Sequence, residues 1–456
     1  MTLKSINPAT GETLETFEEW SGNQVDEQIS KTREAFSEWR ETSFAEREKL
    51  LMNMAKVIRN RAKKYAELIT TEMGKPIIQA EMEVEKCADA CEYFAKHGRR
   101  FLEDDEVELD RDRSYIRFTP LGVILGVMPW NFPFWQVFRW AIPTVLAGNV
   151  LLLKHSSNVP RCGFAAEEIF TDAGFPENVF KFLPIGSKKA EKIIGDPRIA
   201  GVSLTGSTEA GSLVAKAAGA NLKKVVLELG GSDPFIVLED VDLKDVVETA
   251  VKARMVNSGQ SCIAAKRIII MEEIFDDFVE KFTERVSKLV VGDPMDRETE
   301  VGPLAREDIL ELIEKQVEES VKKGAELLTG GKRLDRKGFF YQPTAITNVG
   351  KGIPVYDEET FGPVGVLIKA KNEEEAIRIA NDTTYGLGGS VWTKNVKRGE
   401  EIAKKIEAGM VFVNEIVKSD PRLPFGGVKR SGFGRELSHY GIKEFVNIQT
   451  VYLRTP

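Results

Sequence analysis

The stretch Gly122-Val123-Ile124-Leu125-Gly126-Val127 is a short apolar run of strand-forming residues, and it is the first of a series. Comparable runs follow at residues 149–154, 179–183, 201–204 and 225–229, with helical patterns such as 161–172 and 187–194 between them. Short buried strands that alternate with helices pair in parallel, because each connection crosses the sheet through a helix. The sequence therefore predicts a doubly wound α/β sheet of the kind that binds nucleotides.

A second α/β series follows position 262 and predicts a second domain. Its apolar runs at 268–271, 364–369, 388–392 and 410–414 alternate with helical patterns at 274–290, 306–323, 373–381 and 397–408. A chain of 456 residues is long for a single hydrophobic core, which agrees with two domains.

The composition is that of a globular protein that binds small molecules. Apolar residues make up 42% of the chain and charged residues 29%, and the formal net charge of −8 disfavours a nucleic-acid surface. No apolar stretch reaches the roughly 20 residues of a membrane span. Four cysteines are too few to crosslink this chain and no secretion signal is apparent, so we expect a cytoplasmic protein. The three histidines lie far apart and no CxxC or HExxH spacing occurs, so we expect no metal site.

Residues 106–119 change to the alternating pattern of strands, around a charged turn at 110–113. This pattern predicts a β-hairpin. Because an isolated hairpin is only marginally stable, we expect it to pair with another part of the molecule or with another subunit. Pairing with the sheet of its own domain is the alternative.

One cysteine, Cys262, lies on a polar turn at residues 257–267 with the small neighbours Ser258, Gly259 and Ser261. Small neighbours allow a substrate to approach the sulfur. The thiolate is the reactive form, and it makes up only about 3% of an unperturbed thiol at pH 7, so a nucleophilic role requires help in removing the proton. A lone cysteine can also be simply a small buried hydrophobic residue.

Three loops that follow predicted strands carry further candidate groups. At 204–211, glycines and a helix start could bind phosphate, although a capped helix start needs no ligand. At 129–133, two prolines flank Asn131, whose amide could stabilise an oxyanion or could bond within its own turn. Glu228 precedes two glycines, which suits a general base acting through water, although a strand-end glutamate is often simply solvated.

Together these stretches resemble the NAD(P)-dependent aldehyde dehydrogenase superfamily in order and near spacing, over essentially the whole chain. The matching stretches are 129–133, 206–211, 228–231, 259–262, 359–364 and 424–432. The resemblance implies an α/β fold with a Rossmann-variant cofactor-binding domain, an α/β catalytic domain and a β-hairpin oligomerisation element. In this family the hairpin joins subunits with the last strand, here near 446–453, so a homodimer or homotetramer is expected. The implied limits are 1–101 and 121–229 for the cofactor-binding domain, 230–438 for the catalytic domain, and 102–120 and 439–456 for the oligomerisation element.

The resemblance assigns catalytic roles to three residues. Cys262 is the nucleophile that attacks the aldehyde carbon, and Asn131 forms the oxyanion hole together with the Cys262 backbone amide. Glu228 activates the water that hydrolyses the thioester. This glutamate separates the chain from the acylating subgroup, which transfers the acyl group to coenzyme A. Some relatives have a second cysteine where this chain has Ala264, so a disulfide there is not expected.

The resemblance also implies the cofactor contacts. Glu359 matches the ligand of the nicotinamide ribose, with Phe361 beside the ring, and Lys154 matches the ligand of the adenosine ribose. Many NAD-specific relatives have a glutamate three residues after this lysine, where this chain has Ser157. The serine avoids a repulsion of up to roughly 4 kcal/mol between a carboxylate and a 2′-phosphate, so we expect NADP to be preferred and NAD to be possible. The other expected contacts are Trp130, Asn131, Gly206, Ser207, Thr208, Gly211 and Leu229.

Arg139 lies eight residues after Asn131, on the helix that lines the substrate tunnel in this family, and a cation there suits a substrate with a carboxylate. Succinate-semialdehyde dehydrogenases of the superfamily have an arginine at this place and a serine that Ser419 matches. The second arginine of some of these enzymes is Val256 here, and Arg422 could replace it. We therefore expect oxidation of succinate semialdehyde to succinate. The other expected substrate contacts are Trp135, Ser261 and Phe425.

Three alternatives remain open. Arg139 could form a salt bridge on a buried helix and not contact the substrate. The enzyme could be a broad-range aldehyde dehydrogenase that acts on uncharged or hydroxylated aldehydes. The chain could also be a catalytically silent relative with a structural or binding role, which the joint presence of Cys262, Glu228 and Asn131 disfavours.

Overall fold

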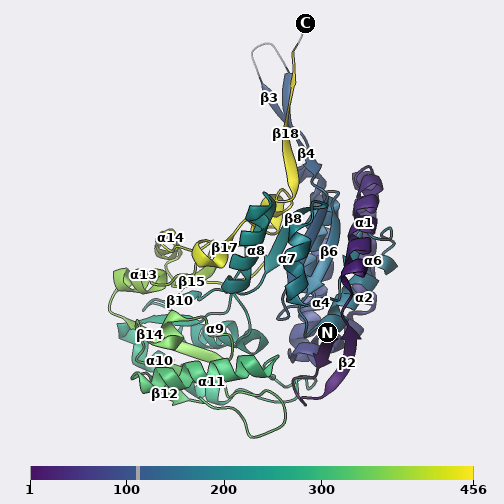
Figure 1. Ribbon diagram of the computed structural model, residues 1–456. Helices are drawn as coiled ribbons and strands as arrows, with labels where there is room; N and C mark the ends of the chain where they lie inside the picture. The colour runs from purple at the N-terminus through teal and green to yellow at the C-terminus, as the bar shows by residue number, and fades with distance from the viewer. Residues whose placement is uncertain (1, 109–112, 455–456) are drawn as a thin grey trace.

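The computed structural model describes residues 2–108 and 113–454, in which two large sheets and a projecting three-stranded sheet carry the fold (Figure 1). Both large sheets are mostly parallel and have helices on their faces. The predicted α/β architecture is therefore confirmed.

The first sheet is built from the predicted runs, each of which is a strand within two residues of the expected limits. Its strands are β5 (Val123–Met128), β6 (Val150–His155), β7 (Phe180–Phe182), β8 (Ile199–Thr205), β9 (Lys224–Glu228) and β17 (Gly432–Phe433), in the order β17-β9-β8-β5-β6-β7. All pairs are parallel except β17 with β9. The strand order reverses between β5 and β8, and ligands of open α/β sheets bind outside the carboxyl ends of strands at such a point.

Helices bury this sheet. α1 (Gly22–Trp39) and α2 (Phe44–Asn60) each begin with a capping box and bury one apolar face. Every residue of α5 (Trp135–Leu146), which connects β5 to β6, is buried, so this helix belongs to the core. The other helices of this unit are α3 (Ala62–Met73), α4 (Ile77–His97), α6 (Pro160–Asp172), α7 (Ser187–Gly195) and α8 (Thr208–Ala220).

The second sheet has the strand order β12-β13-β14-β11-β10-β15-β16, and all its pairs are parallel except β12 with β13. Its strands are β10 (Pro234–Val237), β11 (Arg267–Met271), β12 (Glu326–Thr329), β13 (Thr344–Thr347), β14 (Val364–Ala370), β15 (Gly388–Trp392) and β16 (Met410–Val413). Its helices are α9 (Leu243–Met255), α10 (Phe275–Ser287), α11 (Glu307–Lys322), α12 (Pro354–Asp357), α13 (Glu373–Asn381) and α14 (Val396–Ala403).

The sequence interpretation missed β10, β12, β13 and α9. β10 has only four residues and follows the Glu228 loop closely, so its apolar run could not be separated from that motif. The predicted domain limits remain a prediction, and β17 from the second part of the chain joins the first sheet.

The third sheet projects away from both α/β units (Figure 1). It consists of β3 (Asp105–Glu108), β4 (Arg113–Pro120) and β18 (Val446–Leu453), in the antiparallel order β18-β4-β3. The predicted hairpin therefore pairs with the last strand of its own chain and not with the sheet of its domain. Most of its predicted turn, at 110–112, lies outside the described residues.

A two-stranded sheet of β1 (Thr2–Ile6) and β2 (Thr13–Glu18) and the short helix α15 (Ser438–Gly441) complete the named elements. Every helix in the described ranges is too short or too polar to cross a lipid bilayer.

Candidate active site

Most of the predicted site residues gather at the carboxyl edge of the first sheet. β5 runs into the loop of Asn131, β6 ends next to Lys154, β8 leads into Gly206 and β9 ends at Glu228. Because these strands are parallel, their carboxyl ends lie along one edge. The fold therefore places these predicted cofactor residues and the predicted base on the same side of the sheet, whereas Glu359 and Phe361 precede β14 of the second sheet.

The loop that carries Cys262 has an unusual backbone. Asn257, Ser258 and Gly259 have φ angles of 54°, 55° and 75°, and a Cβ atom on Gly259 would lie 2.1 Å from the carbonyl oxygen of Gly362. Only glycine fits this contact. The buried Arg254 guanidinium donates hydrogen bonds to the carbonyl oxygens of Gly259, Val364 and Thr360, so the loop is tied to the segment that follows Glu359.

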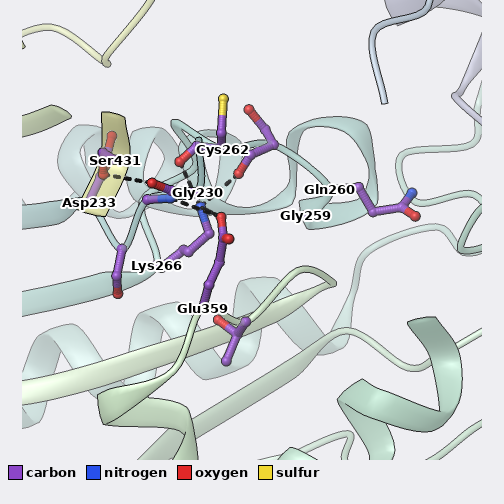
Figure 2. A network of polar contacts seen from close by, with 12 residues as sticks. Gly230, Asp233, Gly259, Gln260, Cys262, Lys266, Glu359 and Ser431 are labelled. Atoms are coloured by element: carbon purple, nitrogen blue, oxygen red, sulfur yellow. Dashed lines mark hydrogen bonds and ion pairs between the residues drawn. The ribbon is translucent and has the colours of Figure 1, made fainter. Parts of the chain in front are cut away.

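Lys266 holds the other end of this loop (Figure 2). Its buried ammonium donates to the carbonyl oxygens of Ser261 and Cys262, at 2.8 Å each, and lies 3.3 Å from the Glu359 carboxylate. Glu359 also accepts a hydrogen bond of 3.1 Å from the Gly231 amide. The Cys262 sulfur points away from this polar network, so the network fixes the backbone and leaves the sulfur free.

The Cys262 side chain is half-buried and lines a cavity. Desolvation in this cavity raises the pKa of the thiol to about 11, and the positive charges of Arg139 and Lys266 oppose the shift. The thiol is therefore protonated at neutral pH in this state. A reaction that uses the sulfur as a nucleophile needs a group that accepts its proton.

Asn131 lies against the cysteine loop although the two are far apart in sequence. Its side-chain amide donates to the Gln260 carbonyl oxygen at 3.2 Å. The Asn257 side-chain amide donates to the carbonyl oxygens of Asn131 and Gln260, at 2.8 and 3.0 Å. The fold thus brings the predicted oxyanion donor to the residues next to Cys262, and one N–H of Asn131 remains available for a ligand.

Buried charges fix the start of α5, next to Asn131. The Glu83 carboxylate on α4 accepts hydrogen bonds from the amides of Phe134 and Trp135, at 2.9 and 3.0 Å, and pairs with the buried Lys75 ammonium. On the other side, the His155 ring contacts the Pro133 carbonyl oxygen at 2.9 Å. Two prolines flank Asn131 in this loop, and these contacts add an anchor on each side.

Glu228 is only 2% exposed, and neither oxygen of its carboxyl group has a hydrogen-bond partner among the described residues. Burial and then the negative charge of Glu436 raise its pKa well above the usual range, while Arg139 and Arg435 oppose the shift. The positive charge of Arg139 thus favours the ionised forms of both Glu228 and the Cys262 thiol. A Cβ atom on Gly426 would lie 2.7 Å from the Glu228 carboxyl, so the glycine leaves room for it.

The predicted substrate residues share one cavity of about 330 Å³ with the nucleophile. Arg139 lines this cavity, but its guanidinium pairs with the buried Glu436 carboxylate and lies 4.1 Å above the centre of the Phe425 ring. The main contact of Arg139 is therefore a salt bridge on a buried helix, which was the alternative to contact with the substrate. Arg422 is not a substitute, because its side chain is 72% exposed and pairs with Asp420. The cavity is lined by Cys262, Trp135, Arg139, Val256, Ser261, Ser419 and Phe425, among others.

Lys154 has the surroundings expected of an anion ligand. Its ammonium is nearly buried at the end of β6, burial lowers its pKa to about 8, and no ion pair to it occurs in the described parts of the chain. Ser157 follows, half-buried, and brings no carboxylate. A buried cation without an anion is costly, so the residues present fit a bound phosphate.

The predicted phosphate loop begins α8. The Ser207 hydroxyl caps this helix by accepting from the Ala210 amide at 3.2 Å. A Cβ atom on Gly211 would lie 2.5 Å from the Leu229 side chain, so this glycine allows α8 to pack on β9. Glu359 contacts Lys266 as described, and the Trp130 and Phe361 rings meet edge to face with their centres 5.7 Å apart. Thr208 donates to the Arg430 carbonyl oxygen at 3.3 Å.

The aldehyde dehydrogenase family model matches residues 1–451. The chain belongs to the aldehyde dehydrogenase family. This aldehyde dehydrogenase is 50% identical over 453 residues to a probable succinate-semialdehyde dehydrogenase (NADP+) of Synechocystis, a match that covers 99% of this chain and 100% of that protein. It is 48% identical over 456 residues to succinate-semialdehyde dehydrogenase (NADP+) 1 of Mycobacterium tuberculosis, with 99% and 100% covered. Its fold matches the crystal structure of succinic semialdehyde dehydrogenase from Streptococcus pyogenes in complex with NADP+, with a TM-score of 0.97, 39% identity and coverage of 99% and 100%.

Several polar residues around the aldehyde dehydrogenase site were not found from the sequence. Glu83 and Lys86 lie on α4, and Glu436 lies after the glycine-rich segment at 424–432. On an amphipathic helix, charged residues at such positions are usually solvated, so α4 offered no signal. Glu436 follows a matched motif, which was the one available clue.

Proposed function

We propose that this enzyme oxidises succinate semialdehyde to succinate and that it uses NADP+ in preference to NAD+. The observation that carries the proposal is that the cavity of Cys262 is also lined by cationic and hydroxyl side chains that can bind a carboxylate. The relatives with this printed activity are about half identical over the full chain, which supports the same assignment.

The proposed catalytic roles are supported by the contacts of the site. The Cys262 thiol gives its proton to a water molecule, the thiolate bonds to the aldehyde carbon, and the resulting oxyanion accepts hydrogen bonds from the Asn131 side chain and the Cys262 amide. Lys154, Ser157 and Glu359 would hold NADP+, which would supply the acceptor for the hydride from this carbon. Glu228 then takes a proton from the water that attacks the thioester, the carbon–sulfur bond breaks, and succinate leaves as the sulfur is regained.

The raised pKa of Glu228 shapes the pH dependence of this reaction. The carboxyl group acts as a base only when it is ionised, and burial together with Glu436 favours its protonated form. The rate of thioester hydrolysis should therefore increase with pH until Glu228 is ionised.

For the cofactor, we assign the 2′-phosphate to Lys154 and Ser157. The Lys154 ammonium forms no ion pair within the described residues, since Glu19, the acid that acts on it, pairs with Lys189, and Ser157 can donate a hydrogen bond to a phosphate oxygen. Ser207 and the free amides at the start of α8 suit the diphosphate.

We also propose that the projecting sheet joins subunits into a dimer or a tetramer of dimers. Its last strand has exposed apolar side chains, with Ile448 60% exposed, which suits burial against a second copy. Light scattering after size exclusion, with Ile448→Lys as the disrupting variant, would measure this state. The four cysteines are all free, which agrees with the expected cytoplasmic location.

A matrix of substrates and cofactors tests the proposed function. Initial rates are measured with succinate semialdehyde and butanal, each with NADP+ and NAD+. We expect kcat/KM to be highest for succinate semialdehyde with NADP+. Equal values for the two aldehydes would instead support the broad-range alternative, and a higher value with NAD+ would reject the cofactor assignment.

A further inference from the structure

Lys86 lines the substrate cavity and has no role in the proposed mechanism. It lies on α4, half-buried, with its ammonium 2.6 Å from the Ser419 hydroxyl and 4.4 Å from the centre of the Trp135 ring. No ion pair to this ammonium occurs within residues 2–108 and 113–454. The nearest acid on the same helix, Glu83, is occupied by Lys75 and by the amides at the start of α5.

The other cations of the cavity differ from Lys86. Arg139 pairs with Glu436, so its charge is offset. Lys252 and Lys418 are exposed to solvent, and Lys418 also pairs with Glu415. Lys86 is therefore the cation of this cavity that is both shielded from water and without an ion-pair partner in the described residues.

The surroundings of Lys86 disfavour its charge. Desolvation and then the nearby Arg139 lower its pKa to about 8, and the acidic groups Cys87, Glu83 and Asp420 oppose this shift only in part. An ammonium in such a place is costly for the folded protein. A bound carboxylate would remove the cost.

The Ser419 hydroxyl is arranged to bind the same anion. Its oxygen accepts hydrogen bonds from the Lys86 ammonium, at 2.6 Å, and from the Trp135 indole N–H, at 2.9 Å. Because both lone pairs of the oxygen are used, the hydroxyl proton is left to donate. The Lys86 ammonium has two further N–H groups. A carboxylate in the cavity can therefore accept from both side chains at once.

We propose that Lys86 joins Ser419, the serine already expected from the resemblance, in binding the terminal carboxylate of the substrate, and that Lys86 provides the charge that selects semialdehydes of short dicarboxylic acids. This inference rests on the proposed function, since it assigns to Lys86 the recognition of the substrate carboxylate. Arg139 is then a positioning residue, which holds Glu436 and the Phe425 ring beside Glu228 and Cys262.

The test compares four proteins: wild type, Lys86→Met, Lys86→Arg and Lys96→Met. Lys96 lies on the same helix but is exposed, so its variant is the matched control. For each, the ratio of kcat/KM for succinate semialdehyde to that for butanal is measured with NADP+. We expect this ratio to fall about 10- to 100-fold in Lys86→Met, mainly through KM, because a charged hydrogen-bonding partner is lost. Lys86→Arg should keep most of the ratio, and Lys96→Met all of it.

A thermal melt separates recognition from folding. Because Lys86→Met removes a half-buried, desolvated charge that has no ion-pair partner among the described residues, its melting temperature should equal or exceed that of the wild type. A structural role for Lys86 would instead lower it.

If Lys86→Met is insoluble, the wild type still decides the question through inhibition by succinate. The inhibition constant of succinate should increase above pH 8 as Lys86 loses its proton, and a constant value between pH 7 and 9.5 would overturn the inference.

If the wild type shows no preference for succinate semialdehyde over butanal, the proposed function itself is wrong. If the wild type shows this preference and Lys86→Met keeps it, only the role of Lys86 is wrong.

Discussion

Replacing Lys266 with methionine tests whether a buried ammonium makes the Cys262 thiol more acidic. The ammonium lies 2.8 Å from the Cys262 carbonyl oxygen, and standard bond lengths keep the sulfur of the same residue within about 7 Å of it. At an effective dielectric constant of 20, a unit charge at about 7 Å contributes about 2.4 kcal/mol, which is roughly fiftyfold in an ionisation constant. Without Lys266, the pKa of Cys262 should rise, and the thiolate fraction at pH 8 should fall about 10- to 100-fold.

The rate of alkylation by iodoacetamide measures this fraction directly. Cys87, Cys91 and Cys162 are buried, so Cys262 is the thiol that reacts in the folded protein. Lys266→Arg should keep the wild-type rate, and Lys281→Met, at an exposed lysine of α10, is the control. If Lys266→Met is alkylated at the wild-type rate while it remains folded by circular dichroism, the electrostatic argument is refuted.

The remaining predictions concern the cofactor, the base and the cysteine loop. Ser157→Glu should lower the ratio of kcat/KM for NADP+ to that for NAD+ by about 100- to 1,000-fold, close to the limit set by one added charge pair, as measured by initial rates. Glu228→Gln should form about one NADPH per site in a stopped-flow burst and then turn over about 100-fold more slowly than wild type, because thioester hydrolysis loses its base. Gly259→Ala places a Cβ atom 2.1 Å from Gly362 at a φ of 75° and should lower the free energy of unfolding by about 3 kcal/mol or more in urea titrations. Gly219→Ala, in open space on α8, should not lower it.

Local sequence patterns supplied the candidates for the catalytic residues, and the resemblance to the aldehyde dehydrogenase superfamily assigned their roles, which remain predictions. Cys262 lies in a turn of small residues, Asn131 lies between two prolines, and Glu228 ends a strand, so each has a recognisable local pattern. The five runs of the first sheet were found for the same reason, because each is an apolar segment of sufficient length with turns around it. The parallel pairing of these strands then placed the loops at one edge.

The groups that act through tertiary contact could not be predicted. Lys86 stands on an ordinary amphipathic helix, and it becomes a cavity residue only because α4 packs beside α5 and the Ser419 loop. The partner of Arg139 is Glu436, which lies 297 positions away. Sequence periodicity carries no information about such pairs. For this reason the sequence predicts that Arg139 contacts the substrate, whereas its main contact in the structure is the buried Glu436 carboxylate.

Loss of Lys86 and loss of Arg139 should therefore have different effects: the first on KM for the charged aldehyde, the second on kcat for every aldehyde. Arg139 lowers the pKa of both Cys262 and Glu228, so Arg139→Met should reduce kcat for charged and uncharged aldehydes alike. It also leaves the buried Glu436 carboxylate without its ion pair and with only the Ser203 hydroxyl as a donor, which should cost about 3 to 5 kcal/mol of stability, and Glu436→Gln in the same protein should restore most of this loss. Parallel measurements of kcat and urea unfolding on the single and double variants check both effects. If Arg139→Met selectively loses activity on succinate semialdehyde and retains butanal turnover, then Arg139 itself binds the substrate carboxylate.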